Sequence, residues 1–468
     1  MSWPGYFLAD LPSDATLTPQ LVAEAIRTLR RNRELYLADR PVTQLVRLLA
    51  EVGRNWMQPD DPFRQRALAE GPERTGFSRA TLERGLDSFF GALTESDLRR
   101  LLVQDLGDPS VLDGFAVVTE PHRVVRARGP RLLVHFAPGN LPDPALQMLV
   151  LGVLVKSAQF MKCSVGGDFL PRLFAHSVRA VDPKLASCLE LAVWPGGRTD
   201  LEEVLLQEAD CVTVAGRDAT VAALRARTPV TTRFLGYGHR VSFGFIGYGV
   251  THEVSLETLA ERAAADVTAW DQAGCLSPHL FYVQTGPDQQ FPVRFAEALA
   301  RALDQWEMRQ PRGPLPPERA ALITARRDLY ALRAACEGHT RVWSSAGSTA
   351  WTVVFEEEPD FQLSCLDRFV YVKPVVSLAR ALQAAEPVRL HVSTVGVAVP
   401  SGTRQVVAEE LTRWGVPRIC PLGRMQQPPW TWHHDGRPAL GDLVCWTDWE
   451  QESAAPSAAA SAGATPAA

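Results

Sequence analysis

The sequence predicts an α/β fold in which helices cover both faces of a parallel sheet. Between residues 131 and 238, five apolar runs of strand length alternate with segments of helical periodicity. A second alternation of helices and strands follows up to residue 375. A chain of 468 residues with 46% hydrophobic content is long enough for two or three packed domains.

The first part of the chain, residues 1–113, predicts a helical region. Apolar residues recur every three or four positions over 22–35, 41–56 and 95–106. From Phe115 the period changes to two. We therefore expect a hairpin over 115–135 that feeds a buried strand at 131–136.

Ligands of a parallel sheet bind at the carboxyl ends of its strands, so the residues that end each run are the ones to inspect. Asp143-Pro144 opens the helix after the first strand. The runs end at Pro138-Gly139-Asn140, Lys162-Cys163-Ser164, Pro195-Gly196-Gly197, Gly216-Arg217 and Gly236-Tyr237-Gly238. The first βα turn carries no GxGxxG, and GFIGYG at 244–249 is more typical of an ordinary turn or bulge.

Cys275 is the residue with the greatest chemical interest. It lies in AWDQAGCLSPH (269–279), between a helical stripe at 256–270 and a strand at 279–285, with small neighbours. Taken alone, this setting suits a catalytic thiol and a buried small hydrophobe equally well. Two long helices and three further strands predict a second α/β domain here, which puts Cys275 at an interdomain seam.

The order Asn140, Lys162, Gly216, Cys275 resembles the aldehyde dehydrogenase superfamily, including the 22 positions from Asn140 to Lys162. Within it, HFAPGN, WDQAGCLSP and the stretch 419–446 resemble the acyl-CoA reductase family typified by the reductase of bacterial bioluminescence. The resemblance covers roughly 115–450.

The resemblance implies an aldehyde-dehydrogenase-like organisation. A Rossmann-type cofactor domain is expected over 114–270, a catalytic cysteine domain over 271–400, and a C-terminal segment over 401–450 that returns to the cleft. The hairpin at 115–135 would be an intersubunit arm of a homo-oligomer. The low-complexity composition of 451–468 predicts a disordered tail.

The resemblance also implies a reaction, the reduction of a long-chain acyl-CoA or acyl thioester to an aldehyde. Cys275 would be the nucleophile, and the Asn140 amide with the Cys275 N–H would stabilise the oxyanion. The cofactor-binding residues would be Lys162, Ser164, Gly216, Arg217, Gly236 and Gly238. An acyl-protein synthetase is a possible partner.

Three departures from ordinary aldehyde dehydrogenases are informative. The segment 235–239 has no carboxylate where those enzymes carry a water-activating glutamate, which suits an enzyme that must not hydrolyse its thioester. Val165 replaces the acid that binds the ribose 2′-hydroxyl, so NADPH is favoured over NADH, with Lys162 attracting the 2′-phosphate. The segment 366–370 offers no glutamate for the nicotinamide ribose.

Composition excludes several other classes. Eight scattered cysteines without a CxxC pair argue against zinc sites and disulfides. The net charge is −5, with acidic and basic residues interspersed along the chain, which argues against nucleic-acid binding. The longest apolar run, 145–155, is too short to span a membrane, so we expect a cytoplasmic protein. His239 reads as structural, and His433-His434-Asp435-Gly436 reads as a loop near the cleft rather than a metal site.

Two functions from other classes stay open on the sequence. The chain could be an acyltransferase or carrier that is acylated on Cys275 without hydride transfer, which the missing glutamate would fit. It could also be a non-catalytic scaffold that docks an acyl-activating complex through its helical first 110 residues.

Overall fold

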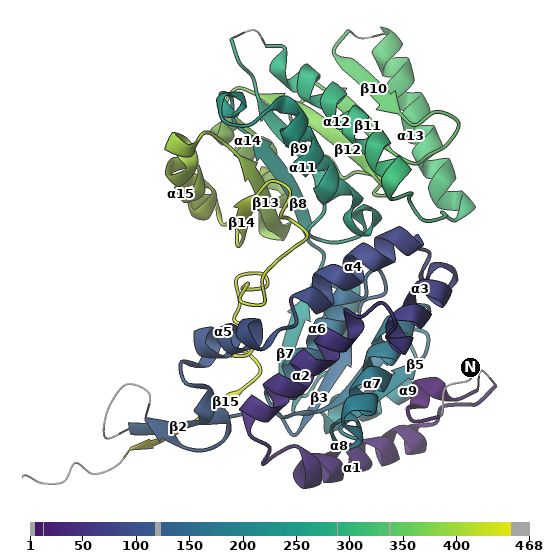
Figure 1. The fold of residues 1–468 in the computed structure, drawn as a ribbon, viewed down its shortest axis with the longest axis vertical. Coiled ribbons are helices and arrows are strands. Elements are labelled where there is room, and N and C mark those ends of the chain that lie inside the picture. The colour runs from purple at the N-terminus through teal and green to yellow at the C-terminus, as the bar shows by residue number, and fades with distance from the viewer. Residues whose placement is uncertain (1–4, 13, 118–122, 288, 337, 451–468) are drawn as a thin grey trace, which may run out of the picture.

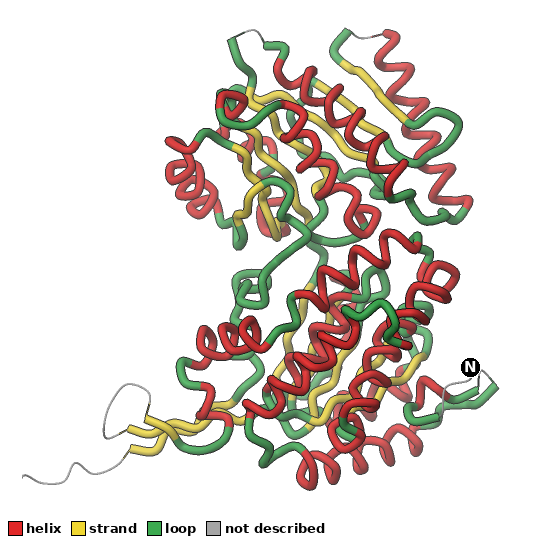
Figure 2. The backbone as a smooth tube through the Cα atoms, viewed as in Figure 1, coloured by secondary structure: helices red, strands yellow, loops and turns green. Residues whose placement is uncertain are grey.

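The computed structural model describes residues 5–450 except 13, 118–122, 288 and 337, so the predicted tail at 451–468 lies outside the described residues. Figure 1 shows two lobes, one above the other, with a small sheet projecting from the lower one. The described strands form sheets of five, seven and three strands. Helices cover both faces of the two larger sheets (Figure 2).

The predicted N-terminal helical region is confirmed. Its elements are η1 (Leu8–Asp10), α1 (Pro19–Tyr36), α2 (Val42–Trp56), α3 (Pro62–Thr75), α4 (Arg79–Gly91), α5 (Glu95–Leu106) and η2 (Pro109–Leu112). Side-chain oxygens of Thr18, Asp61, Ser78 and Thr94 accept N–H groups at the helix starts, which satisfies donors that the helices cannot. These helices pack on the lower lobe and share its core.

The lower lobe is built on a parallel sheet of order β5-β4-β3-β6-β7. Its strands are β3 (Leu132–Phe136), β4 (Ala158–Cys163), β5 (Leu189–Val193), β6 (Cys211–Ala215) and β7 (Arg233–Tyr237). Its helices are α6 (Asp143–Leu154), α7 (Phe169–Val181), α8 (Pro183–Ala186), α9 (Thr199–Glu208) and α10 (Asp218–Arg227). The order of the parallel strands reverses at β3, because β4 and β5 lie on one side of it and β6 and β7 on the other. Doubly wound sheets bind ligands at such a switch point.

The upper lobe is built on the sheet of order β10-β11-β12-β9-β8-β13-β14, in which only β10 and β11 are antiparallel neighbours. Its strands are β8 (Val241–Ile246), β9 (Pro278–Gln284), β10 (Thr340–Ser344), β11 (Thr352–Glu356), β12 (Phe369–Val375), β13 (Val392–Ala398) and β14 (Ile419–Pro421). Its helices are η3 (Val250–His252), α11 (Leu256–Thr268), η4 (Ala269–Gln272), α12 (Phe291–Arg309), α13 (Pro317–Cys336), α14 (Leu378–Ala384), η5 (Glu386–His391), η6 (Ser401–Thr403) and α15 (Arg404–Trp414).

The predicted boundary at residue 270 needs correction. Strand β8 pairs with β9 and β13, and α11 packs in the core of the upper lobe, so the chain changes lobe just after β7. Periodicity located α11 but did not predict β8 as a strand, and sheet membership depends on long-range pairing, which a local pattern does not show. GFIGYG at 244–249 covers the end of β8 and a turn, as expected.

The predicted hairpin is β1 (Ala116–Val117) with β2 (Arg123–Arg128), and a third strand, β15 (Cys445–Glu450), pairs with β2. We call these three strands the arm. The segment before β15 crosses from the upper to the lower lobe, where Trp430, Leu440, Leu443 and Val444 enter the core. The predicted return of 401–450 to the cleft thus continues into the arm.

Among the described residues, no helix combines the length and the apolar character that a membrane span requires.

Candidate active site

The structure brings Asn140 and the Cys275 loop together across the seam. Asn140 follows β3 in the lower lobe, and its Nδ2 donates a 2.8 Å hydrogen bond to the carbonyl oxygen of Ala273, two residues before the nucleophile. Asn140 is exposed and Cys275 is partly exposed, so a substrate can reach both. An amide nitrogen carries two N–H donors, which leaves Asn140 a second one for an oxyanion.

The backbone around Cys275 is held by residues far away in the sequence. Ser242 of β8 donates from Oγ to the Cys275 carbonyl over 2.7 Å and accepts from the Thr394 N–H over 3.2 Å. Gln426, on the crossing segment, donates from Nε2 to Ser277 Oγ over 2.6 Å. The loop therefore has a fixed position before any substrate arrives.

A buried tryptophan anchors the same loop to the lower lobe. Trp270 has a positive φ of 49°, and its indole Nε1 donates to Asp143 Oδ2 over 3.0 Å. A side chain at Gly85 of α4 would lie 2.0 Å from the Trp270 ring, so only glycine fits there. Phe77 meets the same ring edge-on, with centroids 5.1 Å apart. Burial raises the pKa of Asp143 to about 7.

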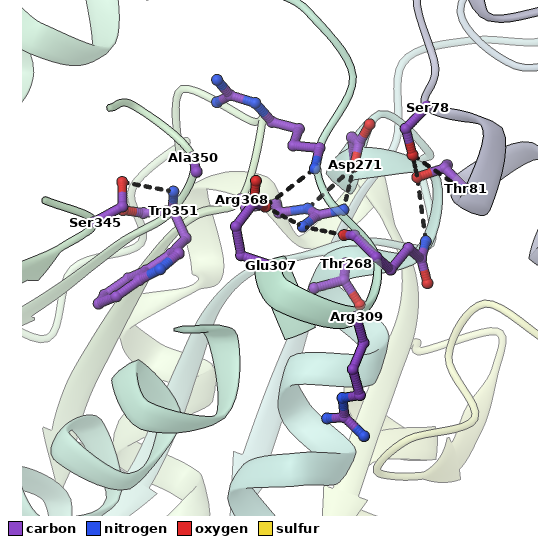
Figure 3. Close-up of polar contacts among 12 residues, drawn as sticks. Ser78, Thr81, Thr268, Asp271, Glu307, Arg309, Ser345, Ala350, Trp351 and Arg368 are labelled. Atoms are coloured by element: carbon purple, nitrogen blue, oxygen red, sulfur yellow. Dashed lines mark hydrogen bonds and ion pairs between the residues drawn. The ribbon is translucent and has the colours of Figure 1, made fainter. Parts of the chain in front are cut away.

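An ion pair anchors the loop to the upper lobe as well (Figure 3). Arg368 is fully buried and donates from Nε and Nη2 to Asp271 Oδ1 over 3.0 and 2.7 Å. It also pairs with Glu307 of α12 at 2.8 Å. Gln272 adds a hydrogen bond from Nε2 to the Phe369 carbonyl at 2.9 Å. We call Trp270, Asp271, Gln272 and Arg368 the loop clamp.

The clamp joins two stretches of unusual backbone. Trp270, Asp271 and Gln272 have φ values of 49°, 49° and 65°, and Leu366, Asp367 and Arg368 have values of 64°, 56° and 65°. Non-glycine residues rarely adopt this region, and they persist there only where the surroundings hold them. The stretch 366–370, where no cofactor glutamate was found, thus contributes Arg368 to the support of the nucleophile loop.

The thiol of Cys275 is protonated at neutral pH in this arrangement. Burial and, to a smaller extent, the negative charge of Asp435 raise its pKa to about 11, against the opposing charge of Arg240. Asp435 pairs with Arg240 at 2.9 Å, and His434 stacks on Tyr237 with ring centroids 4.7 Å apart. The predicted placement of this His-Asp loop near the cleft is confirmed.

The first of the residues expected to bind the cofactor lie at the carboxyl end of β4. Lys162 is buried and its ammonium has no hydrogen-bond or ion-pair partner among the described residues; burial lowers its pKa, against the attraction of Glu202. Ser164 Oγ is buried and also lacks a partner within the described chain. Side chains at Gly139 or Gly167 would come within 2.7 and 2.3 Å of that oxygen. Val165 is 66% exposed beside them.

The glycines at the ends of β6 and β7 differ in how much space surrounds them. A side chain at Gly216 would meet no atom nearer than 3.9 Å, whereas one at Gly236 would lie 2.6 Å from Val221 and one at Gly238 would lie 2.3 Å from Asp218. The last two are explained by the packing of α10. Gly216 is one of the expected cofactor-binding residues, but its N–H donates to the Tyr237 carbonyl over 3.1 Å.

The first turn of α10 is a candidate anion site near Gly216. Arg217 precedes this helix with extended backbone, is exposed, and caps none of its N–H groups with its side chain. Helix starts of this kind bind phosphate oxygens through free N–H groups and the helix dipole. Together with Lys162 and Ser164, whose polar side-chain groups have no partner among the described residues, this helix start fits a dinucleotide.

Sequence reasoning missed Ser242, Thr394, Gln426 and the clamp. Each acts through a contact with a residue far along the chain, such as Gln426 with Ser277, and no local pattern marks it. The positive φ values at 270–272 were equally invisible, because none of these residues is a glycine.

The fold is that of the aldehyde dehydrogenases. The chain is similar to a putative aldehyde dehydrogenase, PutA, from Anabaena variabilis, with a TM-score of 0.66 and 15% identity over 95% of this chain and 96% of that one. It is also similar to betaine aldehyde dehydrogenase from Staphylococcus aureus, with a TM-score of 0.66 and 14% identity over 92% of this chain and 88% of the other.

The chain belongs to the acyl-CoA reductase (LuxC) family, whose model matches residues 37–446. It is 25% identical to the long-chain acyl-protein thioester reductase of Vibrio harveyi over 56% of this chain and 55% of that protein. It is 24% identical to the protein of the same name from Photorhabdus luminescens over 57% of this chain and 54% of that protein. The aligned part thus spans about half the length of these curated relatives.

Proposed function

We propose that this protein reduces a long-chain acyl thioester to a fatty aldehyde, with NADPH as the reductant and an acyl-Cys275 intermediate. The observation that carries the proposal is the hydrogen bond between Asn140 and the Cys275 loop, since it sets an amide donor beside a thiol at an accessible seam. Membership of the LuxC family supports the same reaction.

In the first step the Cys275 sulfur forms a bond to the acyl carbon. The bond from that carbon to the donor's sulfur breaks, and the proton given up by the Cys275 thiol ends on the departing thiolate. The negative charge that develops on the acyl oxygen is stabilised by the second N–H of Asn140 and by the Cys275 backbone N–H, donors of a kind that contribute about 3 kcal/mol each.

Reduction of the acyl-cysteine requires a bound dinucleotide, which supplies the hydride when present. Lys162 and Ser164 would bind the ribose end, and the first turn of α10 at Arg217 the pyrophosphate, with Gly216 leaving room beside it. Lys162 without a partner and Val165 without a carboxylate favour a 2′-phosphate, hence NADPH.

The site lacks a group that would divert the intermediate to hydrolysis. The segment 235–239 has no carboxylate where ordinary aldehyde dehydrogenases are expected to carry a glutamate, and Leu235 is buried in the lower core. Asp435, the carboxylate whose charge acts on Cys275, is neutralised by Arg240. The acyl-cysteine would therefore persist until it is reduced.

The acyl donor is acyl-CoA or an acyl group carried on a protein. The curated relatives are named acyl-protein thioester reductases, which favours a protein-bound donor and a synthetase partner for this chain. A homo-oligomer joined through the arm is part of the same proposal, by analogy with the fold.

One assay tests the reaction against its alternatives. The protein is incubated with palmitoyl-CoA, with and without NADPH, while cofactor absorbance, free CoA and protein mass are followed. Cofactor oxidation with CoA release supports a reductase. CoA release with a stable mass gain, unaffected by NADPH, would indicate the acyltransferase or carrier, and no change in any readout would indicate the scaffold.

A further inference from the structure

A second cavity lies at the opposite edge of the lower sheet from Cys275. It has a volume of about 650 Å³, within the range of small-molecule sites. Arg131, Asp210 and Arg233 line it at the amino ends of β3, β6 and β7. The candidate active site lies at the carboxyl ends of these parallel strands, so the two sites are separate.

The lining of this cavity is strongly cationic, and we call it the basic hollow. Its cations are Arg33, Arg126, Arg128, Arg131, Lys156 and Arg233, and its carboxylates are Glu34, Asp39 and Asp210. The lining thus has three more cations than carboxylates, although the whole chain carries a net charge of −5. Charge of one sign gathered in a concave surface concentrates ligands of the opposite sign.

Half of these cations are neutralised by neighbours. Lys156 pairs with Asp113 at 2.6 Å. Arg33 and Arg131 share Glu34, at 2.8 and 3.7 Å. Because these three cations are held in ion pairs with nearby carboxylates, they contribute little positive charge to the binding of a ligand.

The other three arginines have no acidic partner among the described residues. Arg126 and Arg128 make no side-chain hydrogen bond or ion pair in that part of the chain, and the Arg126 Nε is buried without an acceptor. Arg233 donates only to the backbone carbonyls of Asp442 and Val444, at 2.9 and 2.5 Å. A buried charged donor without an acceptor is costly, so this lining favours an anionic ligand.

The two arginines without a partner in the described part of the chain lie on β2, a strand that the core of the lower lobe holds in place. Arg126 and Arg128 are two residues apart on β2 and so project from one face of the arm. On the opposite face, Val125 and Ala127 are buried in the core of the lower lobe. Cys445, which pairs in register with Arg128, completes this wall.

We infer that the basic hollow binds a small molecule that carries at least two phosphate groups. Each guanidinium can bind phosphate oxygens through two parallel N–H donors. The negative charge of a diphosphate is complementary to Arg126, Arg128 and Arg233, while Leu112, Val155 and Leu443 give an apolar wall for the rest of the ligand. This site is independent of the proposed reductase function.

Calorimetric titration of the full chain with inorganic pyrophosphate and with ADP tests the inference. Wild type is expected to bind at least one of them, more weakly as salt increases. Arg126→Gln/Arg128→Gln should weaken binding by ten-fold or more. Arg404→Gln/Arg413→Gln, the same loss of charge on exposed α15, should leave it unchanged.

Two further variants make the result decisive. Lys162→Ala alters the proposed cofactor site, so binding to the basic hollow should survive it. If the glutamine variant does not fold, Arg126→Lys/Arg128→Lys keeps the charge and should weaken binding about three-fold or more, because lysine lacks the paired donors.

Equal binding by wild type and the Arg126/Arg128 variants would overturn the inference, as would no binding at millimolar ligand. A change of oligomeric mass in the glutamine variant, measured by light scattering and without ligand binding by wild type, would also overturn it. A second copy of the chain would then cover the hollow. Pyrophosphate binding without ADP binding restricts the ligand to compact diphosphates, whereas preference for ADP identifies a nucleotide.

Discussion

The nucleophile side and the cofactor side of the candidate active site are built in different ways. Around Cys275, the clamp, Ser242 and Gln426 tie the loop to both lobes through short contacts. At the end of β4, Lys162 and Ser164 have no partner within the described chain. Under the proposed function, Cys275 is positioned in advance, whereas the proposed cofactor pocket keeps its polar groups for a ligand.

Loss of the thiol should have the largest effect. Cys275→Ser is expected to abolish acyl-enzyme formation and aldehyde production without unfolding, since an unassisted hydroxyl is a far weaker nucleophile than a thiolate. Intact-protein mass spectrometry and an aldehyde assay measure both. Turnover at a tenth of the wild-type rate would remove Cys275 from the mechanism.

Breaking the clamp tests whether the nucleophile side is held as firmly as its contacts indicate. Arg368→Met leaves Asp271 buried without its cation, and we expect a loss of about 3–5 kcal/mol in the free energy of unfolding. Arg309→Met, which breaks an exposed pair with Glu261, should cost about 0–1 kcal/mol. Denaturant titration measures both free energies of unfolding. Similar losses in the two variants would mean that the clamp stabilises the protein no more than an exposed ion pair does.

Asn140→Ala examines a contact between the Cys275 loop and the lower lobe. Turnover should fall about 10²–10³-fold, as it does when one oxyanion donor is lost. NADPH binding, measured by fluorescence titration, should change little, because Asn140 is directed at the Cys275 loop. An unaltered rate would show that Asn140 only supports the loop.

Cofactor selectivity tests the proposed cofactor side, where Lys162 and Val165 lie. Wild type should prefer NADPH to NADH by about ten-fold or more, which corresponds to about 1.4 kcal/mol. Val165→Glu should erode this preference by repelling the 2′-phosphate, and Lys162→Ala should weaken NADPH binding more than NADH binding. Steady-state kinetics with both cofactors measures the effect. Equal use of the two by wild type would contradict the placement of the ribose.

The smallest effect concerns the Cys275 pKa of about 11. Below that pH the thiolate fraction, and hence labelling by iodoacetamide, should rise about ten-fold per pH unit. Asp435→Asn removes a charge that raises the pKa, so labelling at pH 8 should become about three-fold faster or more. Peptide mass spectrometry separates Cys275 from the exposed Cys336 and Cys445. Equal labelling at pH 7 and pH 9 would contradict the raised pKa.

The sequence by itself determined the class of fold and the position of most elements. Helix periodicity located α1, α2 and α5, and apolar runs located the five strands of the lower sheet and β9 to β12 of the upper one, because these signals depend on neighbouring residues. Strands β8, β13 and β14 were not predicted. The spacing of Asn140, Lys162, Gly216 and Cys275 also indicated the superfamily before any contact was known.

Only the tertiary structure decided how the site is assembled. It assigned β8 to the upper sheet, directed the Gly216 N–H to Tyr237, and paired Asp271 with Arg368. It also raised the pKa of Cys275, although the local sequence suggests an accessible thiol. These properties come from burial and from charges that are distant along the chain, such as Asp435, and a local pattern carries no information about either.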